Sequence, residues 1–249
     1  MHYILSARNR AVLENFASSA VLVALDFDGT LAPITTDPGD ATIRPLTRKL
    51  LSQLTSLYPC VVISGRRRAD VRRRLARIHL AEVIGNHGIE PLDSSRTPAA
   101  SAWIPVLKKR LAHFPGILIE NKQFSVSVHY RKERKKKKAL QSILRVARTL
   151  PGARLVGGKR VVNIVPEGAP DKGLALEREM HRQRCNVAIY VGDDETDEDV
   201  FSRARHSKIL GIRVGAKATS LAHFYIRNQR EIDSLLKRLI SCRLHRSSR

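Results

Sequence analysis

The sequence contains few cysteines and lacks a long apolar run. Its three cysteines, Cys60, Cys185 and Cys242, are far apart and form no CxxC pair, which argues against a structural zinc site or a disulfide framework. No apolar run reaches the ~18 residues that a membrane-spanning helix needs. The first residues, MHYILSARNR, lack the apolar region and the cleavage site of a signal peptide. We therefore expect a cytoplasmic, monomeric protein with no membrane partner.

Acidic residues are also scarce relative to basic ones. The 249 residues include 45 Lys and Arg against 23 Asp and Glu, which gives a formal net charge of +22. Such an excess indicates either nucleic-acid binding or attraction of anionic substrates. The basic residues cluster at 66–77, 131–138 and 243–249, without the interleaved aromatic residues that could stack on bases. Solvated helix faces therefore explain these clusters better than a nucleic-acid interface does.

Short apolar runs alternate with helical patterns along much of the chain. The runs predicted to be strands are 21–26, 60–64, 187–191 and 209–214. Between them, leucines recur at helical spacing, for example after Pro45. Continuous apolar strands separated by helices are typical of an α/β fold in which helices cover both faces of a parallel sheet.

The pattern changes between about 92 and 168. Alternating segments with short connections are typical of antiparallel strands that leave one side open to solvent or ligand. Those segments are 117–122, 124–130, 153–157 and 160–165, with helical patterns at 101–113 and 132–149. We therefore predict a small α+β domain at 92–168, inserted into a core domain formed by 1–91 and 169–249.

Polar residues directly follow three of the predicted strands. They are Asp26 and Asp28 after the first, Ser64, Gly65 and Arg66 after the second, and Asp193 and Asp194 after the third. Ligands of open parallel sheets bind at the carboxyl ends of the strands, so we expect these residues at one edge. Clustered carboxylates need a cation, and oxygen ligands favour Mg²⁺, which commonly shares a phosphate with the protein.

This arrangement predicts phosphoryl chemistry. A carboxylate beside a metal ion can attack phosphorus as a nucleophile, and we assign that part to Asp26. Asp28, two residues later, projects to the same side of an extended segment and can protonate the leaving oxygen. Lys172, beside Gly173 at a predicted helix start, is the candidate to neutralise phosphoryl oxygens. Taken singly, each motif could be an ordinary turn or surface residue; their order after apolar strands favours one site.

Four short motifs occur in an order that resembles a known superfamily. The motifs DFDGT (26–30), SGR (64–66), KG (172–173) and GDDETDE (192–198) are similar to those of the haloacid dehalogenase-type phosphotransferases. The complete set resembles that of the trehalose-6-phosphate phosphatases. This resemblance implies a Rossmann-like core with a mobile cap domain, Mg²⁺ dependence, an aspartyl-phosphate intermediate and a part in trehalose biosynthesis.

The resemblance also implies a role for individual residues. The implied catalytic residues are Asp26, Asp28, Ser64 and Lys172. The implied metal ligands are Asp26, Asp28, Asp193, Asp194 and Asp197, with Asp194 or Asp197 in a supporting position. The implied substrate-binding residues are Arg66, Asn86, His87, Glu90, Glu120, Lys122, Ser125, His129, Arg131 and Asn163. For His87, His129 and Arg131 a structural or solvated role is the alternative.

The chain departs from the family pattern at Asn163, where a glutamate is usual. Glutamate would accept hydrogen bonds from sugar hydroxyls as an anion, whereas asparagine both accepts and donates. The resemblance implies trehalose 6-phosphate as the substrate. Asn163 leaves sucrose 6-phosphate or a glucosyl-polyol phosphate as alternatives. A basic nucleic-acid-binding protein on the same fold is the alternative from another class. The presence of every reactive residue favours an enzyme, a phosphoric monoester hydrolase.

Overall fold

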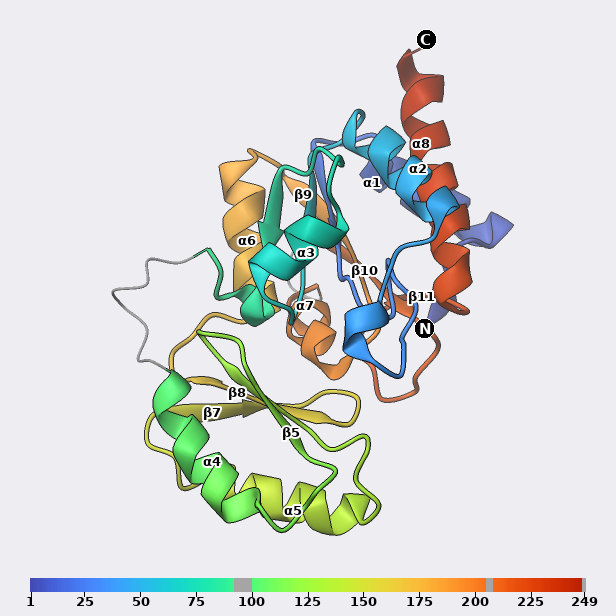
Figure 1. Cartoon of the computed structure of the whole chain (residues 1–249). Coiled ribbons are helices and arrows are strands. Elements are labelled where there is room, and N and C mark those ends of the chain that lie inside the picture. Colours follow the sequence, from blue (N-terminus) through green and yellow to red (C-terminus); the bar gives the residue numbers. More distant parts are fainter. Residues whose placement is uncertain (92–99, 205–207, 248–249) are drawn as a thin grey trace. The chain divides into compact units, whose positions relative to one another are not determined.

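The computed structural model describes residues 1–91, 100–204 and 208–247. The chain forms two compact units (Figure 1): the core, Met1–Gly88 with Asp171–Arg249, and the cap, Ile89–Pro170. The predicted boundaries lie two or three residues from these divisions. The chain leaves and re-enters the core at adjoining points, since a Cβ on Gly88 would lie 2.5 Å from the Asp171 carbonyl oxygen.

The core contains a seven-stranded parallel sheet in the order β1-β11-β10-β9-β2-β3-β4. Its strands are β1 His2–Tyr3, β2 Val21–Leu25, β3 Cys60–Ile63, β4 Glu82–Ile84, β9 Val187–Gly192, β10 Ile209–Val214 and β11 Phe224–Ile226. In the register, Leu25 pairs with Val62 on one side and Val191 on the other. The strands β2, β3 and β9 therefore end at the same edge, as predicted.

Helices cover both faces of the core sheet. They are α1 Arg10–Ala17, α2 Pro45–Thr55, α3 Arg68–Arg74, α6 Lys172–Arg182, α7 Glu198–Arg203 and α8 Ile232–Ser247. Alternate residues of β2 face opposite sides: Val23 belongs to a hydrophobic cluster that includes residues of α1, α2, α3 and α8, whereas Leu22 belongs to one that includes residues of α6 and α7. The predicted α/β core is thus confirmed. Among the described residues, no helix has the length and apolarity that a membrane crossing requires.

The cap contains a four-stranded antiparallel sheet in the order β5-β6-β8-β7. Its strands are β5 Leu118–Asn121, β6 Val126–His129, β7 Ala153–Val156 and β8 Val161–Pro166, and its helices are α4 Ile104–Leu111 and α5 Lys136–Ala147. Val126, Val128 and Ile164 face the helices and pack with Leu107 and Ile143. The intervening strand residues form the other face of the sheet, which these helices leave uncovered.

The helix predicted from residue 132 begins only at Lys136. The reason is a turn fixed by the buried Glu133 side chain, which accepts hydrogen bonds from the backbone N–H groups of Gly116 (3.0 Å) and Lys135 (3.1 Å). Because a short acidic side chain that binds nearby N–H groups competes with helix formation, the basic run starts in a turn.

The edge strand β4 carries a buried carboxylate held by arginines from two helices. Glu82 accepts hydrogen bonds from Arg68 (2.6 Å) and Arg72 (3.2 Å) of α3 and from Arg182 (3.1 Å) of α6. The Val83 N–H also donates to it (2.9 Å). Burial alone would raise the pKa of Glu82, but the hydrogen bonds from Arg68 and Val83 hold that pKa below its ordinary value. The pairs fasten α3 and α6 to this edge of the sheet.

We expect Glu82→Gln to lower the free energy of unfolding at neutral pH by about 1–3 kcal/mol, because the three arginine side chains lose a buried, charged acceptor. Since the folded-state pKa of Glu82 is lowered, its contribution is complete above the unfolded pKa of about 4.3 and is lost as the pH falls through the folded value. Urea unfolding at about pH 7 and at about pH 3.5 measures this difference.

The matched control is Glu177→Gln, an exposed glutamate of α6, which should change the unfolding free energy by less than ~0.5 kcal/mol. A Glu82→Gln effect that is the same at both pH values would contradict the assignment of the lowered pKa to this cluster.

Candidate active site

Three buried carboxylates meet at the carboxyl edge of the core sheet. Asp26 directly follows β2, Asp193 directly follows β9, and Asp197 ends the short 3-10 helix Glu195–Asp197. One oxygen of each lies within 4.8 Å of the others. Their exposures are 4% for Asp26, 3% for Asp193 and 0% for Asp197. Three negative groups at this depth require compensation from the surrounding protein or from a bound cation.

Lys172, the first residue of α6, supplies part of that compensation. Its Nζ atom donates to Asp26 Oδ1 at 2.9 Å and to Asp197 Oδ1 at 2.8 Å. Burial alone would lower the pKa of Lys172, but the carboxylates of Asp197 and Asp26 raise it well above its ordinary value. Helix α6 thus presents a charged ammonium group to the end of β2, held in place by two carboxylates.

Asp26 remains in an environment with an excess of negative charge. Burial raises the pKa of Asp26 well above its ordinary value; Lys172 opposes this effect, and the carboxylates of Asp197 and Asp193 add to it. One ammonium group cannot balance three carboxylates, so an additional cation at this edge would favour the ionised form of Asp26.

The donor set fits Mg²⁺, which prefers carboxylate and carbonyl oxygens. The backbone after Asp28 also comes unusually near these carboxylates. Gly29 adopts a φ of +79°, and a Cβ there would lie 2.2 Å from Asp193 Oδ2. Only glycine permits this approach, which brings the main chain of the DFDGT motif against the Asp193 carboxylate.

Asp197 and Asp194 form hydrogen bonds with each other and with neighbouring residues. Both oxygens of Asp197 accept hydrogen bonds: Oδ1 from Lys172 and from the Tyr190 hydroxyl (2.6 Å), and Oδ2 from the Asp194 N–H (2.8 Å). In return, the Asp194 side chain accepts from the backbone at Asp197, which completes a capping box. These contacts fix the acidic loop and favour a supporting position for Asp194 and Asp197 beside Asp26 and Asp193.

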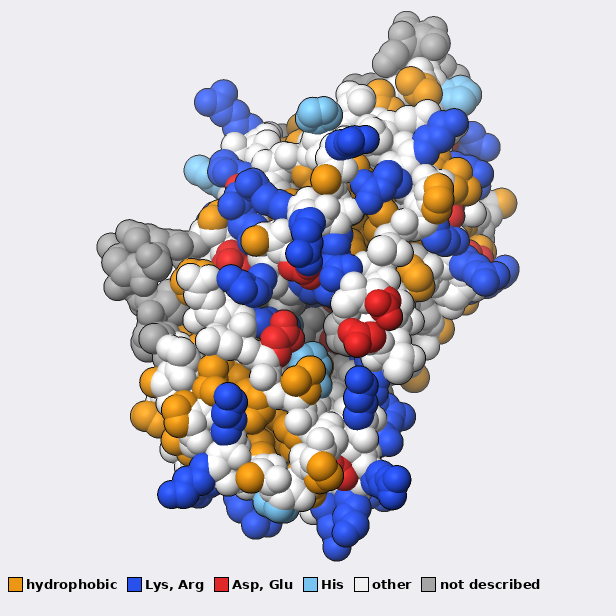
Figure 2. Space-filling model, in the orientation of Figure 1, with side chains coloured by type: hydrophobic (Ala, Val, Ile, Leu, Met, Phe, Trp, Pro, Cys, Tyr) orange, Lys and Arg blue, Asp and Glu red, His pale blue; other side chains and the backbone are white. Residues whose placement is uncertain are grey.

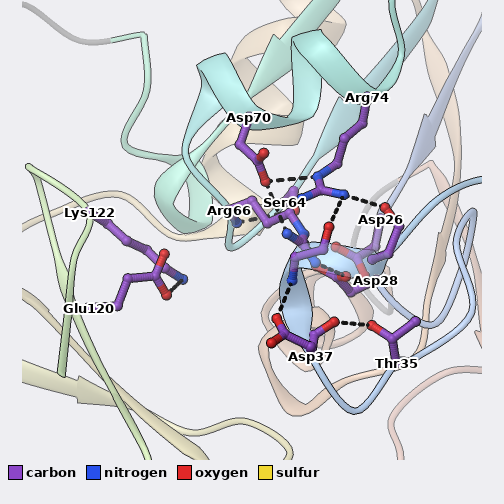
Figure 3. A network of polar contacts seen from close by, with 12 residues as sticks. Asp26, Asp28, Thr35, Asp37, Ser64, Arg66, Asp70, Arg74, Glu120 and Lys122 are labelled. Atoms are coloured by element: carbon purple, nitrogen blue, oxygen red, sulfur yellow. Dashed lines mark hydrogen bonds and ion pairs between the residues drawn. The ribbon is translucent and has the colours of Figure 1, made fainter. Parts of the chain in front are cut away.

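Asp28 points to a different partner. Arg66 contacts both of its oxygens, with Nε 2.6 Å from Oδ2 and Nη2 2.7 Å from Oδ1. Arg66 is held in turn by Asp70 of α3, which also accepts from Arg74 at 3.0 Å (Figure 3). Burial alone would raise the pKa of Asp70, but the hydrogen bonds from Arg74 and Arg66 lower it. The guanidinium that we expected to bind substrate therefore lies on the Asp28 carboxylate.

Ser64 and the segment 86–88 form the next part of this edge. Ser64 Oγ accepts from the Arg66 N–H at 3.2 Å. The N–H groups of Asn86 and His87 donate to the carbonyls of Arg66 (2.7 Å) and Ser64 (3.0 Å). A Cβ on Gly65 would lie 2.4 Å from the His87 ring. Asn86 and His87 thus support the 64–66 turn, and their contact with substrate stays a prediction.

Polar side chains form a row across the face of the cap sheet on which α4 and α5 do not pack. The row comprises Glu120 of β5, Ser127 and His129 of β6, and Asn163 of β8. His129 Nε2 lies 2.9 Å from Glu120 Oε2, and the Ser127 hydroxyl donates to Asn163 Oδ1 at 2.6 Å. Three of the four are predicted substrate-binding residues. Ser127 was missed, although the alternation of β6 places it on the same face as His129.

The remaining predicted substrate-binding residues lie outside this row. Lys122 is 8% exposed, and its Nζ atom lies 4.0 Å from Glu120 Oε2 (Figure 3). Ser125 is fully buried in the turn before β6, where its carbonyl accepts from the Lys122 N–H. Arg131 donates to the Lys159 carbonyl at 3.4 Å. Glu90 is half-buried at the start of the cap.

Arg213 of β10 is a residue of the core site that sequence analysis missed. Its Nη2 atom donates to the Asp193 carbonyl at 2.6 Å, and Nη1 donates to Glu198 at 2.8 Å. The side chain is 5% exposed. The available signal was an arginine inside the apolar run 209–214, because a buried arginine needs anionic or carbonyl partners nearby.

A family model described as Trehalose-phosphatase matches residues 24–230. The chain belongs to the trehalose-phosphatase family. The matched range includes the whole cap, most of the core and every predicted site residue, so the resemblance seen in the sequence motifs is confirmed.

Curated and structural relatives within the family agree with this assignment. Trehalose-phosphate phosphatase of Mycobacterium ulcerans is 36% identical over 196 residues, which cover 72% of this chain and 50% of that protein. The Mycobacterium leprae protein of the same description is 33% identical over 218 residues, 79% of this chain and 51% of that one. This chain therefore spans about half the length of the curated relatives it matches.

The fold is shared with a solved structure. The C-terminal domain of trehalose-6-phosphate phosphatase from C. albicans superposes with a TM-score of 0.81, covers 94% of this chain and 97% of its own, and is 20% identical. At 20% identity this similarity shows only a shared fold, with a parallel core sheet and a separate antiparallel cap sheet.

Proposed function

We propose that the protein is a Mg²⁺-dependent phosphatase that converts trehalose 6-phosphate to trehalose and phosphate. The observation that carries this proposal is the buried cluster of Asp26, Lys172, Asp193 and Asp197. Asp28, two residues after Asp26 in the sequence, is held by Arg66. Membership in the trehalose-phosphatase family supports it. Mg²⁺ held by Asp26, Asp193 and the Asp28 carbonyl would neutralise the charge of the phosphoryl group.

In the proposed reaction, an Asp26 oxygen attacks phosphorus and the bond to the sugar oxygen breaks. Asp28 gives a proton to that leaving oxygen, so trehalose departs as the neutral alcohol. An aspartyl phosphate remains on Asp26. Asp28 then removes a proton from water, which attacks the acyl phosphate and releases inorganic phosphate. Ser64 and Lys172 hold the phosphoryl oxygens in both steps.

Arg66 and Asp70 act as positioning residues in this scheme. Two parallel hydrogen bonds from a guanidinium fix the plane of a carboxyl group, and Arg66 makes such a pair with Asp28. Asp70 holds the opposite side of the same guanidinium at 3.0 Å. The proton-transfer group is thereby directed by side chains from α3 and the 64–66 turn.

The polar row of the cap supplies sugar recognition in the proposal. Glu120 and His129 form a charge-assisted pair suited to neighbouring hydroxyls. Asn163 accepts from Ser127 and also donates to the Gly157 carbonyl at 3.4 Å. A glutamate at this position could not make the second contact, because a carboxylate has no donor. In the proposal, Asn163 therefore makes the preference of this face for particular sugar hydroxyls differ from that of relatives with a glutamate at this position.

The test is a substrate panel with free phosphate as the readout. We expect the kcat/KM for trehalose 6-phosphate to exceed that for sucrose 6-phosphate or a glucosyl-polyol phosphate by at least about tenfold, as correct hydrogen-bond pairing requires. Removing divalent ions with a chelator should abolish the release, and adding Mg²⁺ should restore it. Preference for another sugar phosphate would overturn the sugar assignment alone. No release from any of them with Mg²⁺ would overturn the phosphatase assignment.

A further inference from the structure

The helix layer of the cap contains a groove that the proposed reaction does not use. The groove has a volume of about 610 Å³ and lies between the segment 113–115 and α5. Four cationic side chains, Arg134, Lys135, Lys138 and Arg145, line it. Pockets of about 300–1,000 Å³ suit small organic ligands. Figure 2 shows Lys and Arg side chains gathered over the part of the cap that contains α5.

Two of the four cations lie along one face of α5, and the other two, Arg134 and Lys135, lie in the turn before it. Lys138 and Arg145 are seven residues apart, so they lie on the same side of the helix about 10 Å from each other along its axis. Gln141 and Ser142 lie between them in the groove lining and offer hydrogen-bond donors. This spacing suits an extended chain of anionic groups better than a single phosphate.

Glu133 is the acid among the described residues of the groove lining, and its single charge offsets only part of the charge of the four cations. Glu133 is 5% exposed and accepts from the backbone N–H groups of Gly116 and Lys135. The Lys135 N–H lowers the pKa of Glu133, so the carboxylate stays ionised where it fixes the turn. Within the described part of the chain, no acidic side chain forms an ion pair with Arg134, Lys138 or Arg145. The groove therefore has a positive potential.

The opposite wall of the groove is aromatic. His113 is exposed and Phe114 is half-buried against the cap core. Their ring centroids lie 4.2 Å apart, so together they form a contiguous ring surface at the edge of the cationic face. An anion that also carries a flat ring would contact both walls.

The groove is separate from the polar row of the cap. Glu120, His129 and Asn163 project from the uncovered face of the cap sheet, whereas α5 packs on the other face through Ile143. A ligand in the groove would thus not contact the proposed sugar-binding residues.

We infer that this groove binds a small organic polyphosphate, with its phosphate chain along α5 and its ring against His113 and Phe114. The probes are inorganic tripolyphosphate and adenosine triphosphate, titrated calorimetrically into the full chain. Divalent ions are omitted because they complex both probes. An ionic strength of about 0.15 M limits attraction by charges more than about 8 Å away. We expect saturable binding of both probes, and tighter binding of the nucleotide than of tripolyphosphate.

The groove variant is Lys138→Gln with Arg145→Gln, and it should weaken the binding of both probes at least about tenfold, since two charged contacts are lost. The matched control is Lys108→Gln with Lys109→Gln. These lysines are exposed on α4 and lie outside the groove lining. The control removes the same charge and should weaken binding less than about twofold. Turnover of trehalose 6-phosphate measured in both variants separates this site from the proposed reaction.

Three outcomes would overturn the inference. The first is the absence of saturable binding by either probe. The second is equal weakening in the groove variant and the control, which would mean diffuse attraction to a basic surface. The third is a single-stranded oligonucleotide that binds wild type and both variants alike and displaces the nucleotide from each, which would indicate a spread-out nucleic-acid surface instead.

Discussion

Asp26→Asn is expected to reduce phosphate release by at least about a thousandfold, as loss of a nucleophile does in other enzymes. Asparagine keeps the shape of the side chain but cannot form the aspartyl phosphate. The fold should persist, because Lys172 retains its hydrogen bond to Asp197 at 2.8 Å. Steady-state phosphate release measures the effect, and circular dichroism with urea unfolding checks the fold.

The matched control for this variant is Asp40→Asn, which makes the same chemical change at an exposed aspartate of the core. Its turnover should equal that of the wild type. Turnover within about tenfold of wild type in a folded Asp26→Asn protein would remove Asp26 from the role of nucleophile, since that loss is far below the cost of deleting one.

Lys172→Met is expected to lower the free energy of unfolding by about 3–5 kcal/mol at neutral pH, because it leaves buried carboxylates without their cation. It should also abolish turnover. In the absence of Lys172, burial and the neighbouring carboxylates raise the pKa of Asp26 without opposition. A carboxyl group whose folded pKa is raised makes the protein more stable as the pH falls. Urea unfolding at about pH 8 and about pH 5.5 should show the variant to be more stable at the lower pH.

Two further measurements separate charge compensation from a general packing defect at Lys172. The double variant Lys172→Met, Asp197→Asn removes one carboxylate with the lysine and should regain part of the lost stability, a coupling that a double-mutant cycle quantifies. Mg²⁺ should also raise the stability of Lys172→Met, since a cation that binds only the folded state stabilises it. Destabilisation that is insensitive to pH, Mg²⁺ and Asp197→Asn would show that the lysine acts through packing alone.

The sequence was sufficient to predict the core edge because its strands end in an unusual way. A run such as Val21–Leu25 is buried on both faces, and the carboxylate that follows it has to emerge at a sheet edge. What could not be predicted is which strands are neighbours. The pairing of Leu25 with both Val62 and Val191 is a long-range contact, and it decides that Asp26 meets Asp193.

The motifs also did not predict which side chains contact each other within the site, because these contacts join residues that are far apart in the sequence. Arg66 follows Ser64 in a motif associated with phosphate, yet its bidentate partner is Asp28, 38 residues earlier in the chain. Arg66 also contacts Asp70, a residue of α3 outside every quoted motif. In the cap, the basic run suggested helix from residue 132, but the hydrogen bonds accepted by Glu133 fix a turn that composition does not reveal.

The junction between the two units has a consequence for how such a protein can diversify. Gly88 and Asp171 are in contact, and Asp171 caps the helix that begins with Lys172 by accepting from the Leu174 N–H at 2.8 Å. The inserted unit of eighty-two residues, Ile89–Pro170, is therefore joined to the core at two neighbouring points. Replacing this unit by another would leave Lys172 and the carboxylates that it contacts in place. The substrate preference of such a protein can therefore change while the residues of the proposed reaction stay the same.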